Sequence, residues 1–288
     1  MMCMENKILL YVTKTAAEKY IKKFGQMRDI QLYKILFLIQ QELLKKQIDM
    51  HLPYYWYLKG PLLDVSGFHT QTGVSFTLFS PSKWDGSKKL IAVPSLVVEE
   101  PQKKEIIDQS IDFIIDSIPN KSTATQYLLD EVYKYAPNPF QRSFLKFNSS
   151  IHYEDYEKAK EIFRKMIKEF PRSKFEKMTE LFMEWETTID VAFEIGKLDV
   201  IKGITDAFWK AFCLELSVME HENLTKEQEQ RLIERLDKEY PLEEKTVYDL
   251  CSQFYLSLDD SDFPEESIHD RNGLNKLAFD EYCAEEYE

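Results

Sequence analysis

Glycine is scarce in this sequence, with 8 residues in a chain of 288. Glycine supplies the positive φ angles and close backbone approach on which Gly-rich nucleotide loops, barrel corners and flexible linkers depend. Neither GxGxxG nor GxxxxGK[ST] occurs in the chain, so neither of these phosphate cradles is expected. The scarcity of glycine therefore favours a helical protein without a nucleotide loop of these kinds.

Cysteine and histidine are few and scattered. The four cysteines, Cys3, Cys213, Cys251 and Cys283, form no CxxC pair, and the five histidines form no HxH or HExxH motif. Because zinc sites and thiol exchange need such spacings, we expect structural thiols, no metal and no cofactor. GxSxG, the spacing of a hydrolase nucleophile elbow, does not occur either. A non-enzymatic role is therefore favoured over an enzyme whose site lacks a recognisable motif.

Long apolar runs are also missing. No stretch approaches the roughly 18 uncharged apolar residues that a membrane-spanning helix requires. The longest run near the start, Ile8 to Val12, is too short for the core of a signal peptide. We expect a cytoplasmic protein that does not cross a membrane.

Aromatic residues and charge are abundant, and the charge is uneven. The chain has 19 Phe, 16 Tyr and 4 Trp, enough apolar surface for a folded core. Residues 1–150 hold 19 basic and 15 acidic residues, whereas residues 151–288 hold 18 basic and 35 acidic residues. From Ser257 onward, the sequence has eleven acidic residues and two basic residues, Arg271 and Lys276. This acidic end is typical of a solvated tail or of a strip that binds a basic protein partner.

The first half of the chain has the element order of a winged helix. Helices are predicted from Lys14 to Phe24 and from Asp29 to Lys46, where apolar residues recur at i, i+3 and i+4 and Asp29 is placed to cap the helix. Apolar and polar residues alternate over residues 73–79, as in a half-buried strand. Residues 80–87 are predicted to form a turn and residues 88–93 the returning strand. Further helices are predicted over residues 100–118 and 122–135, the second ended by Pro137 and Pro139.

The second half is helical by period. Residues 148–153 are interpreted as a connection, and helices are predicted over residues 153–170, 173–195, 199–219, 225–240 and 242–258. Pro171, Gly196, Asn223 and Pro241 are expected to separate them, and Thr225 with Gln228 has capping-box spacing. The predicted fold is mainly α: a winged-helix-like domain with a small β-hairpin (1–148), a helical bundle (149–258) and an acidic segment (259–288).

Two groups of side chains are candidates for contacts with partners. Lys83, Lys88 and Lys89 flank the expected hairpin turn, and Lys103 and Lys104 begin the next helix, positions from which a winged helix contacts phosphates. Aromatic residues within the acidic segment are candidate anchors for a protein partner: Phe263, Phe279 and Tyr282.

A row of acidic residues and a set of large aromatic side chains occupy the helices predicted over residues 173–195 and 199–219. Glu186, Asp190 and Glu194 step by four along one helix and could bind a divalent cation, but an ordinary charged helix surface is favoured because no second helix offers matching ligands. Aromatic residues on both helices have core spacing: Phe182, Trp185, Phe193, Phe208, Trp209 and Phe212.

Two segments resemble a known family. The helix segment Leu32-Tyr33-Lys34-Ile35-Leu36-Phe37-Leu38-Ile39-Gln40-Gln41, followed by Tyr54-Tyr55-Trp56-Tyr57-Leu58-Lys59-Gly60-Pro61-Leu62, resembles the pattern of Panacea or SocA-type antitoxin domains and related winged-helix-like bacterial and archaeal proteins. The resemblance covers about residues 29 to 65. It implies a protein that works by binding another protein, as an antitoxin or an adaptor, and no catalytic residues carry over.

These observations lead to one principal hypothesis and one alternative. The chain is expected to be a non-enzymatic protein-interaction subunit, antitoxin- or adaptor-like, of a bacterial toxin–antitoxin or phage-defence system. The alternative is a DNA-binding regulator, or an accessory subunit of a DNA-acting complex, with the N-terminal half in contact with DNA.

Overall fold

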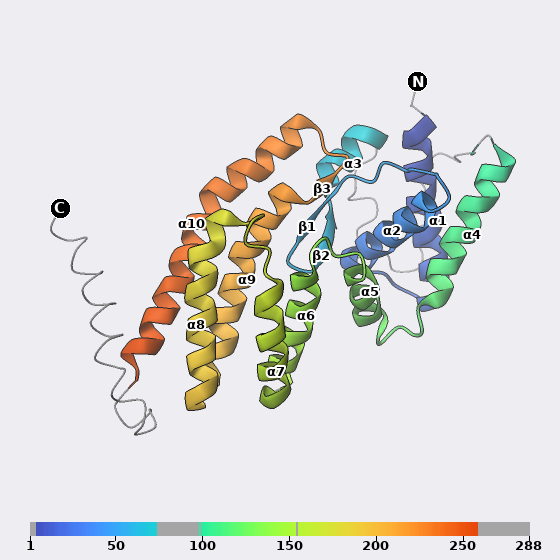
Figure 1. Cartoon of the computed structure of the whole chain (residues 1–288). Helices are drawn as coiled ribbons and strands as arrows, with labels where there is room; N and C mark the ends of the chain where they lie inside the picture. Colours follow the sequence, from blue (N-terminus) through green and yellow to red (C-terminus); the bar gives the residue numbers. More distant parts are fainter. Residues whose placement is uncertain (1–3, 74–97, 99, 154, 259–288) are drawn as a thin grey trace.

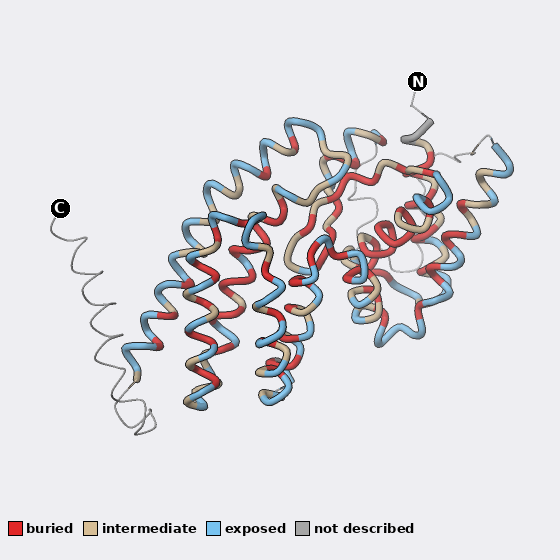
Figure 2. Tube along the Cα trace, in the orientation of Figure 1, coloured by how far each residue is buried: buried red, intermediate tan, exposed pale blue. Residues whose placement is uncertain are grey.

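The computed structural model describes residues 4–73, 98, 100–153 and 155–258 (Figure 1). This part of the chain is mainly helical, with one small antiparallel sheet. None of its helices combines the length and the apolar character needed to cross a membrane. Buried positions line the inner sides of the helices, whereas their outer sides are exposed (Figure 2).

The two N-terminal helices are α1 (Met4–Phe24) and α2 (Asp29–Leu44). Both predicted helices are confirmed, and α1 begins ten residues earlier than its prediction. The expected apolar face of α2 is buried, with Leu36 and Ile39 fully so. Asp29 does not cap α2 as predicted: the cap is Arg28, whose backbone N–H donates to Oε1 of Gln31 at 2.8 Å.

The aromatic segment after α2 forms a hairpin at the centre of the molecule. β1 (Tyr54–Tyr57) pairs antiparallel with β2 (Gly60–Leu63), and β3 (His221–Glu222) adds to the other side of β1. Strand order is therefore β2-β1-β3. A strand from the second half of the chain thus completes a sheet begun in the first half, an arrangement that sequence periodicity did not indicate.

The hairpin expected over residues 73–93 cannot be compared with the structure. Residues 74–97, including the two predicted strands and Lys83, Lys88 and Lys89, lie outside the described residues. Before them lies α3 (Val65–Thr72), an unpredicted helix that Gly73 ends with a φ of +70°.

The middle of the chain contains α4 (Pro101–Ser117), α5 (Ala124–Tyr133) and α6 (Pro139–His152). The first two confirm predicted helices. The connection predicted over residues 148–153 is wrong, because α6 continues to His152. Its buried face, formed by Phe140, Phe144, Phe147 and Ile151, follows the helical period and outweighs the polar run from Asn148 to Ser150. Division of the chain at residue 148 stays a prediction.

The second half contributes three long helices. They follow α7 (Tyr156–Met166) and two short 3₁₀ turns, Ile167–Glu169 and Glu176–Met178. The long helices are α8 (Thr179–Ile195), α9 (Asp199–Met219) and α10 (Lys226–Leu256). Gly196 ends α8 with a φ of +74°, and Thr225 and Gln228 form the expected capping box.

Pro241 does not separate two helices, which corrects the prediction at this position. It lies inside α10, which continues for 31 residues. Proline removes one backbone N–H and crowds the carbonyl four residues earlier, on Asp237. Both Pro241 and Asp237 are exposed, so water can satisfy that carbonyl while packing of α10 along α9 holds the helix together.

The aromatic side chains form one connected core. Trp185 stacks on Phe208 with ring centroids 4.4 Å apart, and Phe144 stacks on Trp209 at 4.0 Å. The predicted core aromatics of α8 and α9 are all buried. Because the cluster extends from Ile8 on α1 to Phe254 on α10, apolar contacts connect the two halves of the chain.

Candidate functional site

The two segments of the family resemblance meet at one contact. Lys34 on α2 is buried and donates from Nζ to the backbone carbonyl oxygen of Pro61 on β2 at 2.7 Å. Burial, together with the nearby charge of Lys59, lowers the pKa of Lys34 to about 7. This lysine thus joins the helix segment of the pattern to its Gly-Pro segment.

Residues from the second half of the chain hold the same turn. The turn from Tyr57 to Pro61, called the hairpin turn below, accepts a hydrogen bond at the Leu58 carbonyl from Nε1 of Trp209 at 3.0 Å. Arg235 on α10 donates from Nη2 to the Tyr57 hydroxyl at 2.5 Å and lies over its ring, 4.4 Å from the centroid. The hairpin turn is therefore a junction between the two halves of the chain.

Gly60 allows this junction to pack closely. Its φ is +83°, and a Cβ added there would lie 3.1 Å from Cγ1 of Val132 and 3.4 Å from the ring of Tyr133. A glycine is thus required both by the left-handed backbone and by the approach of α5. These contacts give the pattern a structural role within the chain.

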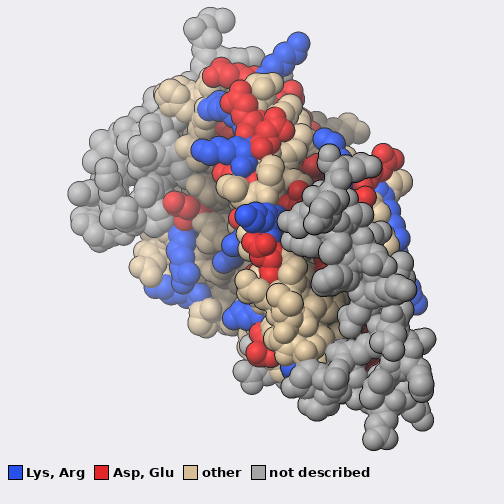
Figure 3. All heavy atoms as spheres, turned by 90° about the vertical axis from the view of Figure 1, so that its left-hand side faces the viewer, with Lys and Arg blue, Asp and Glu red and all other residues tan. Residues whose placement is uncertain are grey.

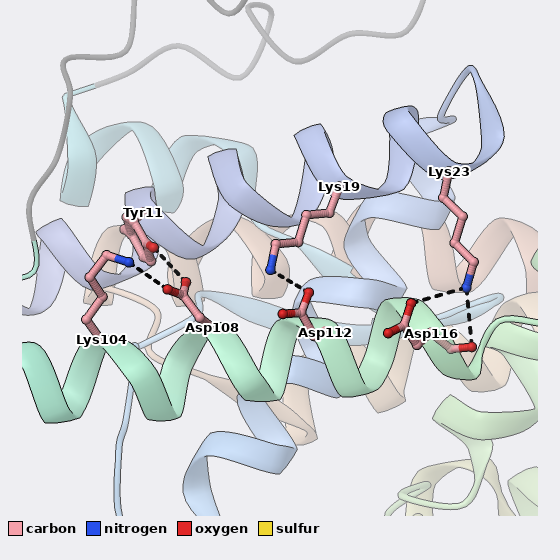
Figure 4. Close-up of polar contacts among 7 residues, drawn as sticks. All are labelled: Tyr11, Lys19, Lys23, Lys104, Asp108, Asp112 and Asp116. Carbon is pink, nitrogen blue, oxygen red and sulfur yellow. Dashed lines mark hydrogen bonds and ion pairs between the residues drawn. The ribbon is translucent and has the colours of Figure 1, made fainter.

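The described lysines among the predicted phosphate contacts lie at the start of α4. Lys103 is half-buried, and Lys104 donates from Nζ to Oδ2 of Asp108 at 2.6 Å. The Tyr11 hydroxyl donates to the other oxygen of Asp108 at 2.6 Å, and the Lys104 ammonium lies over the Tyr11 ring (Figure 4). Lys104 is therefore already bound to a carboxylate of its own chain.

This contact is the first of a ladder between α1 and α4. The helices run side by side, and Lys19 and Lys23 of α1 reach Asp112 and Asp116 of α4 (Figure 4). Because Asp108, Asp112 and Asp116 step by four, they share one helix face. The ladder matches α1 to α4 in register, and the carboxylates of α4 neutralise the lysines that contact them.

The acidic row on α8 forms ion pairs with basic residues of neighbouring segments. Glu194 contacts Lys160 at 3.0 Å and Arg164 at 3.1 Å, and Glu186 lies 3.6 Å from Arg172. No group of three or more metal-ligating side chains occurs within the described ranges. The arrangement fits the favoured interpretation of this row as a charged helix surface.

A surface on α8 and α10 exposes apolar and aromatic side chains among carboxylates. Met183 is 51% exposed, Tyr248 37% and Tyr255 38%; with Glu180 and Glu184 they are called the α8–α10 face below. Burial raises the pKa of Tyr248, and the charges of Glu244, Glu180 and Glu184 raise it further. Burial also raises the pKa of the half-buried Glu184. Three carboxyl groups, of Glu180, Glu184 and Glu244, therefore lie near the exposed Tyr248 side chain.

Figure 3 views the molecule from the side of α8 and α10, where basic and acidic residues alternate and an uncharged area lies in the lower part of the view. Sequence reasoning missed the face, because its residues come from two helices, α8 and α10, that α9 separates along the chain. The predicted anchors Phe263, Phe279 and Tyr282 lie outside the described residues.

Comparisons of the chain with protein-family models, with curated proteins and with solved structures find no match.

Proposed function

We propose that this chain is a non-enzymatic protein-interaction subunit, antitoxin- or adaptor-like, which binds its partner through the α8–α10 face. The observation that carries the proposal is the exposure of Met183, Tyr248 and Tyr255 beside Glu180 and Glu184. Tyrosine is enriched among residues that dominate binding energy, and exposed apolar surface with a polar rim marks binding sites. The partner is expected to present apolar and basic side chains to this face.

The family resemblance supports the same role. Its two segments meet at the Lys34–Pro61 hydrogen bond, which is consistent with one folded unit in which both segments are needed. The proposal also includes a winged-helix arrangement of the N-terminal half and its separation from the helical half at residue 148. It further includes a cytoplasmic location and membership of a toxin–antitoxin or phage-defence system.

Affinity capture with matched variants tests the proposal. Tagged wild type is compared with the double variant Met183→Asp/Tyr248→Asp and with the control Phe113→Asp, which replaces a side chain 63% exposed on α4. One polypeptide should be retained in stoichiometric amount by wild type and by the control and lost from the double variant. Equal thermal melting of the three proteins shows that the fold is kept. Retention by the double variant, or by none of the three, would contradict the proposal.

DNA binding is the alternative. Two of its candidate lysines, Lys103 and Lys104, lie at the start of α4. Lys83, Lys88 and Lys89 lie outside the described residues, and Lys104 is bound to Asp108. If the alternative holds, wild type binds duplex DNA at low salt, and replacing Lys83, Lys88 and Lys89 with Glu abolishes binding and flattens its salt dependence. Absence of binding by wild type removes the alternative.

A further inference from the structure

A groove lies between α5, α6 and α7. Its volume is about 740 Å³, and we call it the α5–α7 groove. Arg142, Ser143, Lys146 and Ser149 line its α6 wall. Arg142 and Ser143 precede Lys146 by four and three residues, and Ser149 follows it by three, so these side chains lie on one side of the helix. Lys134 at the end of α5 and Lys158 on α7 line the opposite walls.

The basic side chains of the groove differ in how many hydrogen-bond donors they have left for a ligand. Lys134 pairs with Glu131 at 2.5 Å, and Arg142 donates from Nη1 to the Ala136 carbonyl at 3.4 Å, which leaves other guanidinium donors. Lys146 and Lys158 are exposed and have no ion-pair or hydrogen-bond partner in the part of the chain that the structure describes.

The carboxylates that line the groove already accept hydrogen bonds. Glu169 accepts from the Ser143 hydroxyl at 2.6 Å, and Asp130 accepts from Nε2 of Gln126 at 2.9 Å. Four cations and two carboxylates therefore face the same space, and the two unpaired lysines give it an excess of positive charge.

We propose that the α5–α7 groove binds a small phosphorylated molecule. Phosphate oxygens accept from ammonium, guanidinium and hydroxyl donors, all of which line the groove. Its volume lies within the range of about 300–1,000 Å³ usual for small-molecule sites. A nucleic acid strand fits less well, because the lining aromatic, Tyr133, is 3% exposed and offers no stacking surface for bases.

Titration calorimetry at low ionic strength with three probes tests the proposal. The probes are inorganic pyrophosphate, ATP without metal, and single-stranded oligothymidylate. Pyrophosphate and ATP should bind wild type, and the double variant Lys146→Gln/Lys158→Gln should lose about tenfold or more in affinity because charge-assisted hydrogen bonds are removed. Binding should also weaken as salt is added.

A control variant tests whether the loss of affinity is specific to the lysines of the groove. Lys202→Gln on α9 removes an exposed lysine that does not line the groove and should bind both small probes as wild type does. The replaced lysines are exposed, so unchanged thermal melting is expected for every variant. No binding of either small probe, unchanged affinity in the double variant, or binding of oligothymidylate alone would each overturn the proposal.

Discussion

Lys34 and Pro61 are joined by a hydrogen bond from an ammonium group to a backbone carbonyl, 2.7 Å long and buried. In the described structure Lys34 makes this contact without an ion pair to a carboxylate. The contact ties α2 to the hairpin turn, which Trp209 and Arg235 hold from the other side. Stability should therefore depend on the protonation of Lys34 and on the packing at the hairpin turn.

The pH dependence of stability follows from Lys34. Burial lowers its pKa in the folded chain to about 7, whereas an unfolded lysine has its ordinary value near 10.4. Between these values the unfolded chain binds the extra proton, so the Lys34 contribution to stability rises with pH, on the order of 1 kcal/mol per pH unit. Below about pH 7 both states are protonated, and the contribution is constant at its least favourable level.

Lys34→Met isolates this contribution from the other titrating groups. The free energy of unfolding of wild type minus that of the variant should rise between pH 7 and pH 9, measured by urea denaturation. Groups common to both proteins, including the buried Cys213 thiol and Tyr133 hydroxyl whose pKa values burial raises, cancel in the difference. A difference independent of pH would show that Lys34 is not the titrating group.

Leu36→Ala should destabilise the chain strongly. The side chain is fully buried on α2, and truncation of a buried leucine costs about 2 to 5 kcal/mol through lost burial and the cavity that remains. Leu44→Ala on the same helix removes a side chain that is 43% exposed and should change stability by no more than about 0.5 kcal/mol. Equal denaturation midpoints for the two variants would contradict the burial of this face.

Gly60→Ala tests the close packing at the hairpin turn. The new Cβ would lie 3.1 Å from Val132 and strain a φ of +83°. Gly25→Ala is the control, since Gly25 has a φ of +86° and nothing within 4 Å of the new Cβ. The control should lose about 1 to 2 kcal/mol from backbone strain alone. Gly60→Ala should lose more, and similar losses in chemical denaturation would mean that α5 does not constrain this turn.

Deletion of the residues after Asp259 should leave the described fold intact. Among the described residues, the last member of the core is Phe254 on α10, so the truncated chain keeps every described member of the buried cluster. Circular dichroism and the melting temperature should stay close to wild type, while association with a basic protein partner weakens because eleven acidic residues from Asp259 onward are reduced to one. Loss of cooperative melting would show that the segment stabilises the core, and undiminished binding would remove its role in association.

Several helices were predictable because their information is local. The helical period identified α2, α4 and α9, and Gly196 and the Thr225–Gln228 box marked ends correctly. Residues three and four apart lie on adjacent turns of one helix, and a capping residue acts within one turn. The mainly helical fold and the buried aromatics of α8 and α9 belong to this predictable part, whereas the ion pairs of the acidic row on α8 were not predicted.

Tertiary packing decided the rest. Pro241 lies within α10 because contacts with α9 hold the helix, and residues 148–152 are helical because the aromatic face of α6 is buried. The bonds from Arg235 to Tyr57 and from Trp209 to Leu58 span 178 and 151 residues. The α8–α10 face and the α5–α7 groove likewise combine side chains from different helices. Such pairings depend on how helices pack in three dimensions, and the local periodicity of the sequence does not predict which helices pack together.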